Sequence, residues 1–474
     1  MTVCEAGSQD GMLREVVRET GVDSDAPIID FVERFGQINP DLTVGVDVSS
    51  APTLVANEGI AHDGVKLHGR AFILTPSQAA YVGLGNRLGL DRFIRPYRNG
   101  RDLASHSRGL LVIDLFGLSA AEVRDQFPEV YQHLLGTVKP ERDLNNRESY
   151  RTNWWIFGEP RRELRPAVSG LTRFIVTVDT ARHRVFQFLP QGIVCDDKSV
   201  IVASDDGFLL GVLSARTHVL WALRAGGWLG VGNDPVYTKT RTFDPFPFPA
   251  ADDLQKQRIR NIAEDLDAHR KRVLAEHAHL TLTGLYNVRE RLRAGAKPET
   301  LDPGERRIFD DGLVLILNEL HDKLDSAVAA AYGWPADLAD EDVLARLVAL
   351  NKERAQEEAR GLVRWLRPEY QIPRFGSPKE KAKLDLVGGG AGAEAPAAAG
   401  ARPNFPADDL GQTAAVMAAL ASASAPLSAD ALAAGFKQGR KIAPKVAAVL
   451  AALARTGYVA TPDRGRTFAL RRAA

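Results

Sequence analysis

Cysteine is almost absent from this 474-residue sequence, which contains only Cys4 and Cys195. Two cysteines so far apart supply neither a disulfide framework nor the closely spaced ligands of a zinc site, and they are typical of a reducing cytoplasm. Long apolar runs are absent too. The longest candidate, residues 208–223, is interrupted by Arg216 and His218 and falls short of the ~20 residues of a membrane span. The first residues have neither the basic nor the apolar region of a signal peptide. We therefore expect a cytoplasmic protein without a membrane partner.

The sequence also lacks a net charge, because 60 Lys and Arg residues balance 60 Asp and Glu residues. Attraction to a polyanion must then come from local patches of positive charge, not from the molecule as a whole. The histidines are scattered, with no pair at helical or zinc-finger spacing, so we expect no metal site. The glycines Gly83, Gly85 and Gly89 have the wrong final spacing for a nucleotide-binding loop and indicate a turn.

The residues that are present predict an α+β fold with several domains. Apolar segments with the character of strands are 42–48, 69–75, 110–116, 174–178, 184–188, 199–203 and 208–213. Few helices separate them, and one begins at Ser119, where Ser119 and Glu122 have the pattern of a capping box. From residue 251 to about residue 367 the pattern becomes helical, with mixed charge. We therefore expect a short first segment, residues 1–75, a mixed-sheet domain, residues 76–250, and a helical domain, residues 251–383.

The rest of the sequence predicts a linker and a small separate domain. Residues 384–404 are rich in Gly and Ala, as in flexible linkers. Residues 405–474 predict three helices, one capped by Ser428, and then two short strands around a turn at 463–465, the element order of a winged helix. Nine Lys and Arg residues face only four Asp residues in this tail, and Lys441 and Arg464 lie at the third helix and the wing, where such domains meet DNA. A winged helix used only for protein contacts is the alternative.

Basic and aromatic residues gather between residues 95 and 241, a mixture typical of surfaces that bind nucleic acid. Aromatic rings stack on bases, while Arg and Lys neutralise phosphates and reach base edges. The loop 95–102 has three arginines beside a tyrosine and a turn glycine, which suits phosphate binding; a solvated loop with internal Arg–Asp pairs is the alternative. Of the neighbours Trp154 and Trp155, we expect one ring in the core and one at the surface. Asn233 suits a bidentate contact to adenine, or a turn beside Gly232. The predicted DNA contacts are Arg95, Arg98, Arg101, Arg147, Tyr150, Trp154, Arg173, Arg184, Asn233, Lys239 and Arg241, with Lys441 and Arg464 in the tail.

Two segments resemble methyltransferase motifs but do not complete them. Residues 112–119 are similar to the loop that holds S-adenosylmethionine, yet of the glycines that this loop needs only Gly117 is present, and a capped helix follows. Residues 243–249 are similar to the Asp-Pro-Pro-Phe/Tyr motif that grips an extruded adenine, but Phe246 separates the prolines. We interpret the first segment as a strand-to-helix turn and the second as an apolar strap packed on the preceding domain.

Seven short motifs, taken together, resemble one known family. They are residues 64–69, 94–102, 130–135, 150–155, 183–186, 229–237 and 243–249. They resemble the C-terminal half of the large bacterial DNA adenine methyltransferases related to MmeI-type restriction–modification enzymes and to the methylase of DISARM phage-defence islands. The resemblance covers roughly residues 1–371. It implies that residues 1–75 are the remnant of an α/β methyltransferase sheet and that residues 76–250 are a target recognition domain, followed by the helical domain.

This resemblance implies an activity together with a missing part. The family transfers a methyl group from S-adenosylmethionine to the exocyclic amine of an adenine that is flipped out of double-stranded DNA. Family members carry the methyl-donor loop and the Asn-Pro-Pro-Tyr/Phe motif upstream of the segment where this sequence begins, and neither motif occurs here. Because methyl transfer needs the donor in line and the amine polarised, we expect no cofactor site and no catalytic residue in this chain. It would recognise DNA and depend on a separate catalytic chain; a DNA-binding protein or regulator without enzymatic role is the alternative.

Overall fold

The computed structural model describes residues 10–21, 28–36, 38–39, 43–229, 234–387, 404–406, 408–421, 427–455, 459–460 and 467–470. The chain divides into two compact units, residues 1–384 and 385–474. This boundary lies in helix α17 (Pro378–Val387), next to the predicted end of the helical domain. Most of the predicted linker, residues 388–403, lies outside the described residues. The predicted divisions at residues 75 and 250 stay predictions.

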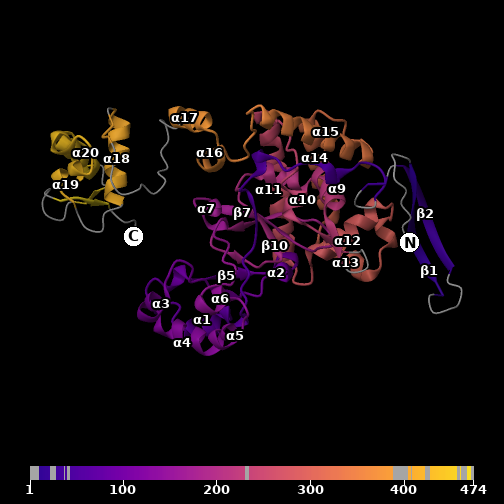
Figure 1. The fold of residues 1–474 in the computed structure, drawn as a ribbon, viewed down its shortest axis with the longest axis horizontal. Coiled ribbons are helices and arrows are strands. Elements are labelled where there is room, and N and C mark those ends of the chain that lie inside the picture. The colour runs from indigo at the N-terminus through magenta and orange to yellow at the C-terminus, as the bar shows by residue number, and fades with distance from the viewer. Residues whose placement is uncertain are drawn as a thin grey trace. The chain divides into compact units, whose positions relative to one another are not determined.

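The described part of the first unit begins with a two-stranded antiparallel hairpin, β1 (Gly11–Thr20) and β2 (Ile28–Gly36). Gly11 lies opposite Gly36, and the pairing has one irregularity, between Val16 and Arg18. Figure 1 shows this hairpin as a long ribbon with no helix over either face. Its apolar side chains are therefore exposed, and Phe35 keeps 72% of its surface accessible.

A smaller lobe is built on a four-stranded sheet in the order β4 (Ile73–Leu74), β6 (Leu111–Ile113), β5 (Ile94–Arg98) and β9 (Val194–Cys195). The pairs β4–β6 and β5–β6 are antiparallel and β5–β9 is parallel, so the predicted mixed sheet is confirmed. Its helices are α1 (Pro76–Tyr81), α2 (Gly100–Ala104), α3 (Ala120–Gln126), α4 (Pro128–Thr137), α5 (Lys139–Asp143) and α6 (Glu148–Thr152). Ser119 and Glu122 form the predicted capping box at the start of α3.

The second sheet of this unit is wholly antiparallel, in the order β3 (Ala61–Asp63), β10 (Ser199–Val202), β7 (Arg173–Val178) and β8 (Gln187–Pro190). Both faces of its central strands are covered, which explains why they appear in the sequence as continuous apolar runs. Strands β3 and β4 both come from residues 1–75, so each four-stranded sheet combines strands from the two sides of the predicted boundary at residue 75.

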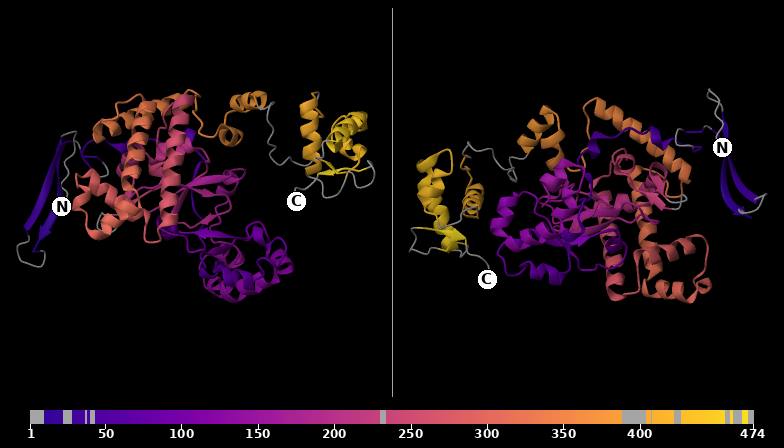
Figure 2. Two further views of the ribbon diagram at one scale, coloured as in Figure 1. Left: turned by 180° about the vertical axis from the view of Figure 1, so that it is seen from behind. Right: turned by 60° about the horizontal axis from the view of Figure 1, so that its bottom comes forward.

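Helices surround the second sheet and form most of its core. They are α7 (Leu164–Val168), α8 (Gly207–Ser214), α9 (Arg216–Ala225), α10 (Lys239–Thr242), α11 (Asp253–Glu276), α12 (Leu282–Arg293), α13 (Pro303–Asp311), α14 (Val314–Tyr332), α15 (Asp340–Ala359) and α16 (Pro368–Phe375), with a short hairpin of β11 (Gly227–Leu229) and β12 (Asp234–Val236). The predicted helical region is thus confirmed, and α11 and α14 pack side by side (Figure 2). Among the described residues, no helix is both long enough and apolar enough to cross a membrane.

Four strand predictions were wrong in detail. Residues 69–75 form a 3₁₀ turn at Arg70–Phe72 before the two-residue strand β4. Residues 208–213 lie in helix α8, capped by Asp206; every residue of α8 is buried, so the apolar run has no periodicity that distinguishes a helix from a strand. Residues 42–48 form no strand in their described part, where a single bridge pairs Ile38 with Val44. Residues 184–188 begin as a loop, and β8 starts only at Gln187. The α+β class itself is confirmed.

The described residues of the second unit form three α-helices and a pair of strands in the predicted order: α18 (Asp409–Ala421), α19 (Ala429–Ala434), α20 (Ala443–Arg455), and β13 (Val459–Ala460) antiparallel to β14 (Ala469–Leu470). A short 3₁₀ helix, Gly439–Ile442, precedes α20. Ser428 caps α19 as predicted, accepting a hydrogen bond from the backbone of Ala431. The turn at 463–465 lies outside the described residues. The assignment as a winged helix stays a prediction.

Candidate nucleic-acid interface

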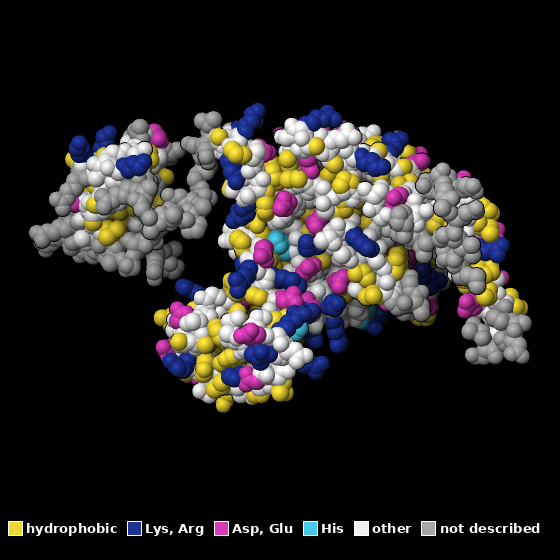
Figure 3. All heavy atoms as spheres, viewed as in Figure 1, with side chains coloured by type: hydrophobic (Ala, Val, Ile, Leu, Met, Phe, Trp, Pro, Cys, Tyr) yellow, Lys and Arg dark blue, Asp and Glu magenta, His cyan; other side chains and the backbone are white. Residues whose placement is uncertain are grey.

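A groove with a volume of about 660 Å³ lies where the smaller lobe meets the second sheet. One wall is the start of α2, and the other walls are the ends of β7 and β8 and the first turn of α12. Its charged side chains are Arg101, Arg182, Lys198, Asp196 and Asp234. Figure 3 shows Lys and Arg side chains gathered with Asp and Glu side chains in the region where the lower lobe joins the rest of the unit.

A second cavity of about 280 Å³ shares Arg182 and His183 with this groove. Five arginines line the second cavity, against two carboxylates: Arg182, Arg184, Arg216, Arg289 and Arg293, with Glu290 and Asp325. The Nε atom of Arg289 has no hydrogen-bond partner among the described residues, and burial lowers the pKa of its guanidinium although the charges of Asp325 and Asp322 oppose this. We call the two cavities together the arginine groove. Several of its basic side chains are ion-paired, Arg182 with Glu290, Arg216 with Asp340, Arg293 with Asp322 and Lys198 with Asp179.

Local structure fixes Arg101 at the rim of the arginine groove. Asn99 caps α2 and accepts hydrogen bonds from the backbone of Arg101 and Asp102. Burial alone would raise the pKa of Asp102, but hydrogen bonds from Arg108 and from the backbone of Asn99 hold that pKa below its ordinary value. The cap and the Arg108–Asp102 ion pair stabilise the loop, while the Arg101 side chain is exposed and makes no ion pair among the described residues.

Asp196 gives the groove a titratable group. Burial, assisted by the charge of Asp197, raises the pKa of Asp196 to about 6, although hydrogen bonds from Ser199 and from the backbone of Lys198 oppose the rise. A carboxylate at this position repels phosphate. The positive character of the groove therefore increases as the pH falls through about 6.

Arg184 was expected at the surface and is instead buried. Its guanidinium donates to the backbone oxygens of Val178, Asp179 and Pro235 and to the hydroxyl of Thr177. Burial lowers its pKa to about 10. Because carbonyl groups occupy its donors, Arg184 positions the loop after β7 and cannot reach a DNA base without breaking these bonds.

Tyr150 and Trp154 are also buried, so the prediction that they stack on bases from the surface was wrong. Trp154 packs in the smaller core, while Trp155 is only half-buried and donates a hydrogen bond from its indole nitrogen to the Leu118 backbone. One ring therefore lies in the core, as predicted. Arg147 is exposed and lies over the Tyr150 ring, donating to its hydroxyl at 2.8 Å.

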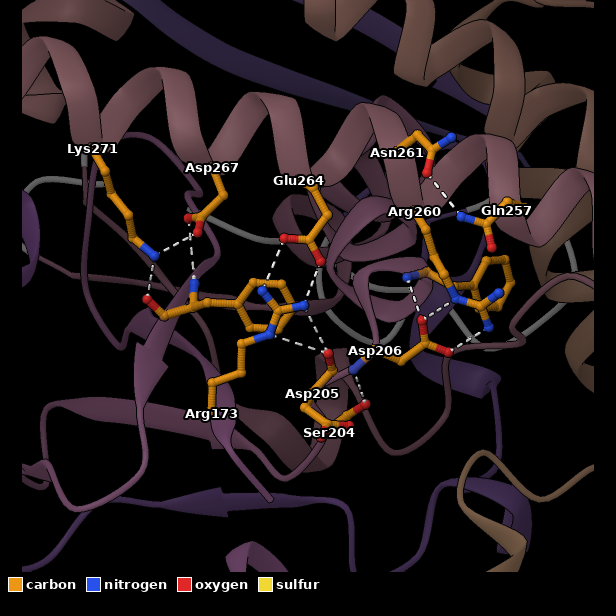
Figure 4. Close-up of polar contacts among 12 residues, drawn as sticks. Arg173, Ser204, Asp205, Asp206, Gln257, Arg260, Asn261, Glu264, Asp267 and Lys271 are labelled. Atoms are coloured by element: carbon orange, nitrogen blue, oxygen red, sulfur yellow. Dashed lines mark hydrogen bonds and ion pairs between the residues drawn. The ribbon is translucent and has the colours of Figure 1, made fainter. Parts of the chain in front are cut away.

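Arg173 is held within the protein by three partners, and Figure 4 labels two of them, Glu264 and Asp205. Its guanidinium pairs with Glu264 of α11, donates to the carbonyl of Asp205, and lies 3.6 Å from the centre of the Phe188 ring. The neighbouring pair of Arg260 and Asp206 ties α11 to the cap of α8. Arg173 thus joins the second sheet to α11, a structural role that the prediction of a DNA contact missed.

The other predicted contacts are dispersed. Arg95 pairs with Asp114 and donates to the backbone of Gly192, and Arg98 donates to the backbone of Tyr97. Lys239 lies 3.7 Å from Asp244, whereas Arg241 is exposed and makes no side-chain contact of this kind among the described residues. Lys441 is exposed in the second unit, and Asn233 and Arg464 lie outside the described residues.

The arginine groove contains residues that the sequence analysis did not select. Lys198 follows two aspartates, and Arg289 and Arg293 belong to a helix of mixed charge. All three residues therefore have the sequence context of an ordinary solvated surface. Arg182 directly precedes the cluster at 183–184, and this was the one usable signal. Only the packing of α12 and α14 beside the loop after β7 brings these side chains together.

The apolar strap at 243–249 is confirmed. Phe243 and Phe246 are fully buried, and the side-chain amide of Asn57 donates to the backbone oxygens of Phe243, Asp244 and Phe246. The carbonyl groups at the motif-like sequence are thus occupied by a donor from the same chain, not free for an adenine amine.

No protein-family model and no curated protein sequence matches this chain. Among solved structures, the chain has the fold of a restriction–modification enzyme: it is similar to the type IIL enzyme MmeI in complex with DNA, with a TM-score of 0.52 and 18% sequence identity. The match covers 72% of this chain and 42% of the MmeI chain, so the present chain spans less than half of that enzyme. The resemblance expected from the motifs is confirmed at the level of the fold, and membership of the methyltransferase family stays a prediction.

Proposed function

We propose that this chain is the DNA-recognition part of an S-adenosylmethionine-dependent, adenine-specific DNA methyltransferase of restriction–modification or phage-defence type. The observation that carries the proposal is the arginine groove, set in a fold shared with the DNA-bound enzyme MmeI. Arg101, which is exposed and makes no ion pair among the described residues, is available to phosphates and base edges, and Arg289 lines the same groove. Asp196 and Asp234 favour entry of a base edge that carries donors over a second phosphate.

Methyl transfer in this proposal needs a catalytic part with the donor loop and the Asn-Pro-Pro-Tyr/Phe motif, neither of which occurs in these 474 residues, and we propose that a partner chain supplies it. Hairpin β1–β2 is the surface we assign to that partner. It exposes apolar side chains from both strands, among them Val17, Ile28 and Phe35, and ordinary soluble proteins cover such strands. A separate chain that adds a strand or an apolar face to the hairpin would bury them.

DNA binding is tested with a labelled random-sequence duplex and fluorescence anisotropy at several salt concentrations. We expect a dissociation constant on the order of 10⁻⁴–10⁻⁶ M near physiological salt for non-specific duplex, weakening steeply as salt rises. Selection from a randomised duplex library should then yield one preferred site. No binding even at low salt would remove the proposal.

Methyl transfer is tested with labelled S-adenosylmethionine and duplex DNA. This chain alone should transfer no label, and addition of a partner chain that carries the missing motifs should give N6-methyladenine. Phe35→Asp should abolish co-purification with the partner and leave DNA binding by the isolated chain unchanged. Transfer of label by this chain alone would contradict the proposal that this chain recognises DNA and a partner chain catalyses methyl transfer. A specific duplex site with no partner chain and no transfer would favour the alternative, a non-enzymatic DNA-binding protein.

A further inference from the structure

We propose that His277, His279 and Asp311 form a binding site for a divalent transition-metal ion of the Zn²⁺ type. Each residue offers one ligand atom, and the three atoms lie within 4.8 Å of one another. Asp311 Oδ2 is 3.2 Å from His279 Nε2 and 3.8 Å from His277 Nδ1. Ligands bound to zinc at ~2.0–2.2 Å in a tetrahedron lie roughly 3.3 Å from one another, so the cluster needs little adjustment to enclose an ion.

The donor atoms define the class of ion. Two imidazole nitrogens with one carboxylate oxygen suit Zn²⁺, Co²⁺ or Ni²⁺, whereas Ca²⁺ and Mg²⁺ take mainly oxygen ligands. Three protein ligands leave at least one coordination position for water or another ligand. No other group of three such side chains occurs among the described residues.

The histidine side of the site is held by its local backbone. His277 follows the last residue of α11, and its carbonyl accepts a hydrogen bond from the backbone of Leu280 at 3.0 Å. Leu280 is fully buried and anchors the short turn. Thr281 then caps α12 by accepting a hydrogen bond from Gly284. This turn places His277 and His279 with ring centres 5.9 Å apart on the same side.

The carboxylate comes from the last residue of α13. Phe309 is buried and Gly312 donates to the carbonyl of Ile308, so the end of this helix is fixed against α11 and α12. The other charged group close to Asp311 is Arg307, whose Nε lies 3.6 Å away on an exposed side chain. Arg307 is free to turn toward solvent when an ion takes its place. The two segments are remote in sequence, so the spacing of the histidines alone did not point to this cluster.

An ion at this site would connect the α11–α12 turn to the end of α13. The first turn of α12, with Leu282 and Thr283, forms part of the wall of the groove that also contains Arg101. The metal would thus stabilise one wall of the arginine groove without touching DNA. This inference does not depend on the proposed function.

The test uses the full chain without a histidine tag, freed of metal by a chelator and titrated with Co²⁺. We expect visible absorption bands of His- and carboxylate-bound Co²⁺ that saturate at one ion per chain and disappear on addition of Zn²⁺. Asp311→Asn keeps the side-chain shape and should weaken binding at least about tenfold, as should His279→Ala. Arg307→Ala removes a competing cation and should strengthen it several-fold. His133→Gln, in the smaller lobe, is the matched control and should leave the spectrum unchanged.

Thermal unfolding gives a second readout that does not depend on the visible absorption of Co²⁺. Zn²⁺ should raise the melting temperature of the wild-type chain and of the His133→Gln control, because an ion that binds only the folded state stabilises it. The Asp311→Asn chain should show little or no rise. The proposal is overturned if wild type binds no Co²⁺ in the visible spectrum, or if Asp311→Asn and His279→Ala bind it as tightly as wild type does.

Discussion

The carboxylate of Asp114 accepts two hydrogen bonds from the guanidinium of Arg165, at 2.8 and 2.9 Å. Arg95 adds a third contact at 3.2 Å, and the Asp114 side chain is almost completely buried. Asp114 belongs to the segment whose sequence is similar to a methyl-donor loop. Its charge is neutralised by two arginines of the same chain, and through Arg165 it joins the end of β6 to α7.

We predict that Asp114→Ala destabilises the first unit by about 3 kcal/mol, because Arg95 and Arg165 would lose their shared partner in a largely buried site. The free energy of unfolding, from urea denaturation followed by circular dichroism, measures this change. Asp125→Ala removes a carboxylate that pairs with Arg124 on the exposed surface and should change it by less than about 0.5 kcal/mol. Equal effects of both substitutions would contradict a structural role for Asp114.

Arg101→Ala and Arg289→Ala are predicted to weaken DNA binding by about 1–3 kcal/mol each if they meet bases, and by less if they meet phosphates. In the second case the logarithmic salt dependence should become shallower by about one unit for each lost contact. Arg306→Ala is the matched control, because Arg306 is paired with Asp310 on the surface of α13. If Arg101→Ala and Arg289→Ala both bind DNA with wild-type affinity in the anisotropy assay, the arginine groove is not the DNA-binding site.

Asp196 should make DNA binding depend on pH. Its pKa is raised to about 6, so protonation as the pH falls below about 6 removes a negative charge from the groove. Removing one repulsive charge near a phosphate corresponds to roughly 1 kcal/mol, or about a fivefold tighter complex. His183 also lines the groove, so the diagnostic quantity is the difference between wild type and Asp196→Asn. That variant should bind more tightly at pH 8 and gain less on acidification; identical pH profiles would exclude Asp196.

Two buried histidines should make stability depend on pH. Burial lowers the pKa of His218 to about 3 and holds the pKa of His321 well below its ordinary value. Between pH 6.5 and the lowered pKa of each histidine, the unfolded chain binds a proton that the folded chain does not bind. The free energy of unfolding therefore falls as the pH falls, by ~1.4 kcal/mol per pH unit for each group. In His218→Gln the free energy of unfolding, measured by urea denaturation, should change less steeply between pH 6.5 and 5, by the contribution of one histidine. An unchanged slope would mean that His218 is accessible to protons in the folded state.

Much of the fold follows from local sequence. The capping boxes at Ser119 and Asp252 satisfy backbone groups within one turn, so they form wherever the helix forms. Strands β7 and β10 were predicted from short continuous apolar runs, and the helices after residue 251 from their apolar periodicity. Helix α8 could not be recognised, because a helix buried on all sides shows no apolar stripe.

The sequence by itself determined the α+β class, the helical region after residue 251, the three helices of the second unit, and the concentration of basic and aromatic residues in the region 95–241. Only the tertiary structure decided what those residues do. Arg173 and Arg184 have the same chemistry as Arg101, yet packing gives the first two internal partners and leaves the third exposed. In the same way, only the approach of α13 to the α11–α12 turn brings Asp311 to His279. Burial and long-range neighbours depend on the path of the whole chain, which no short window of sequence contains.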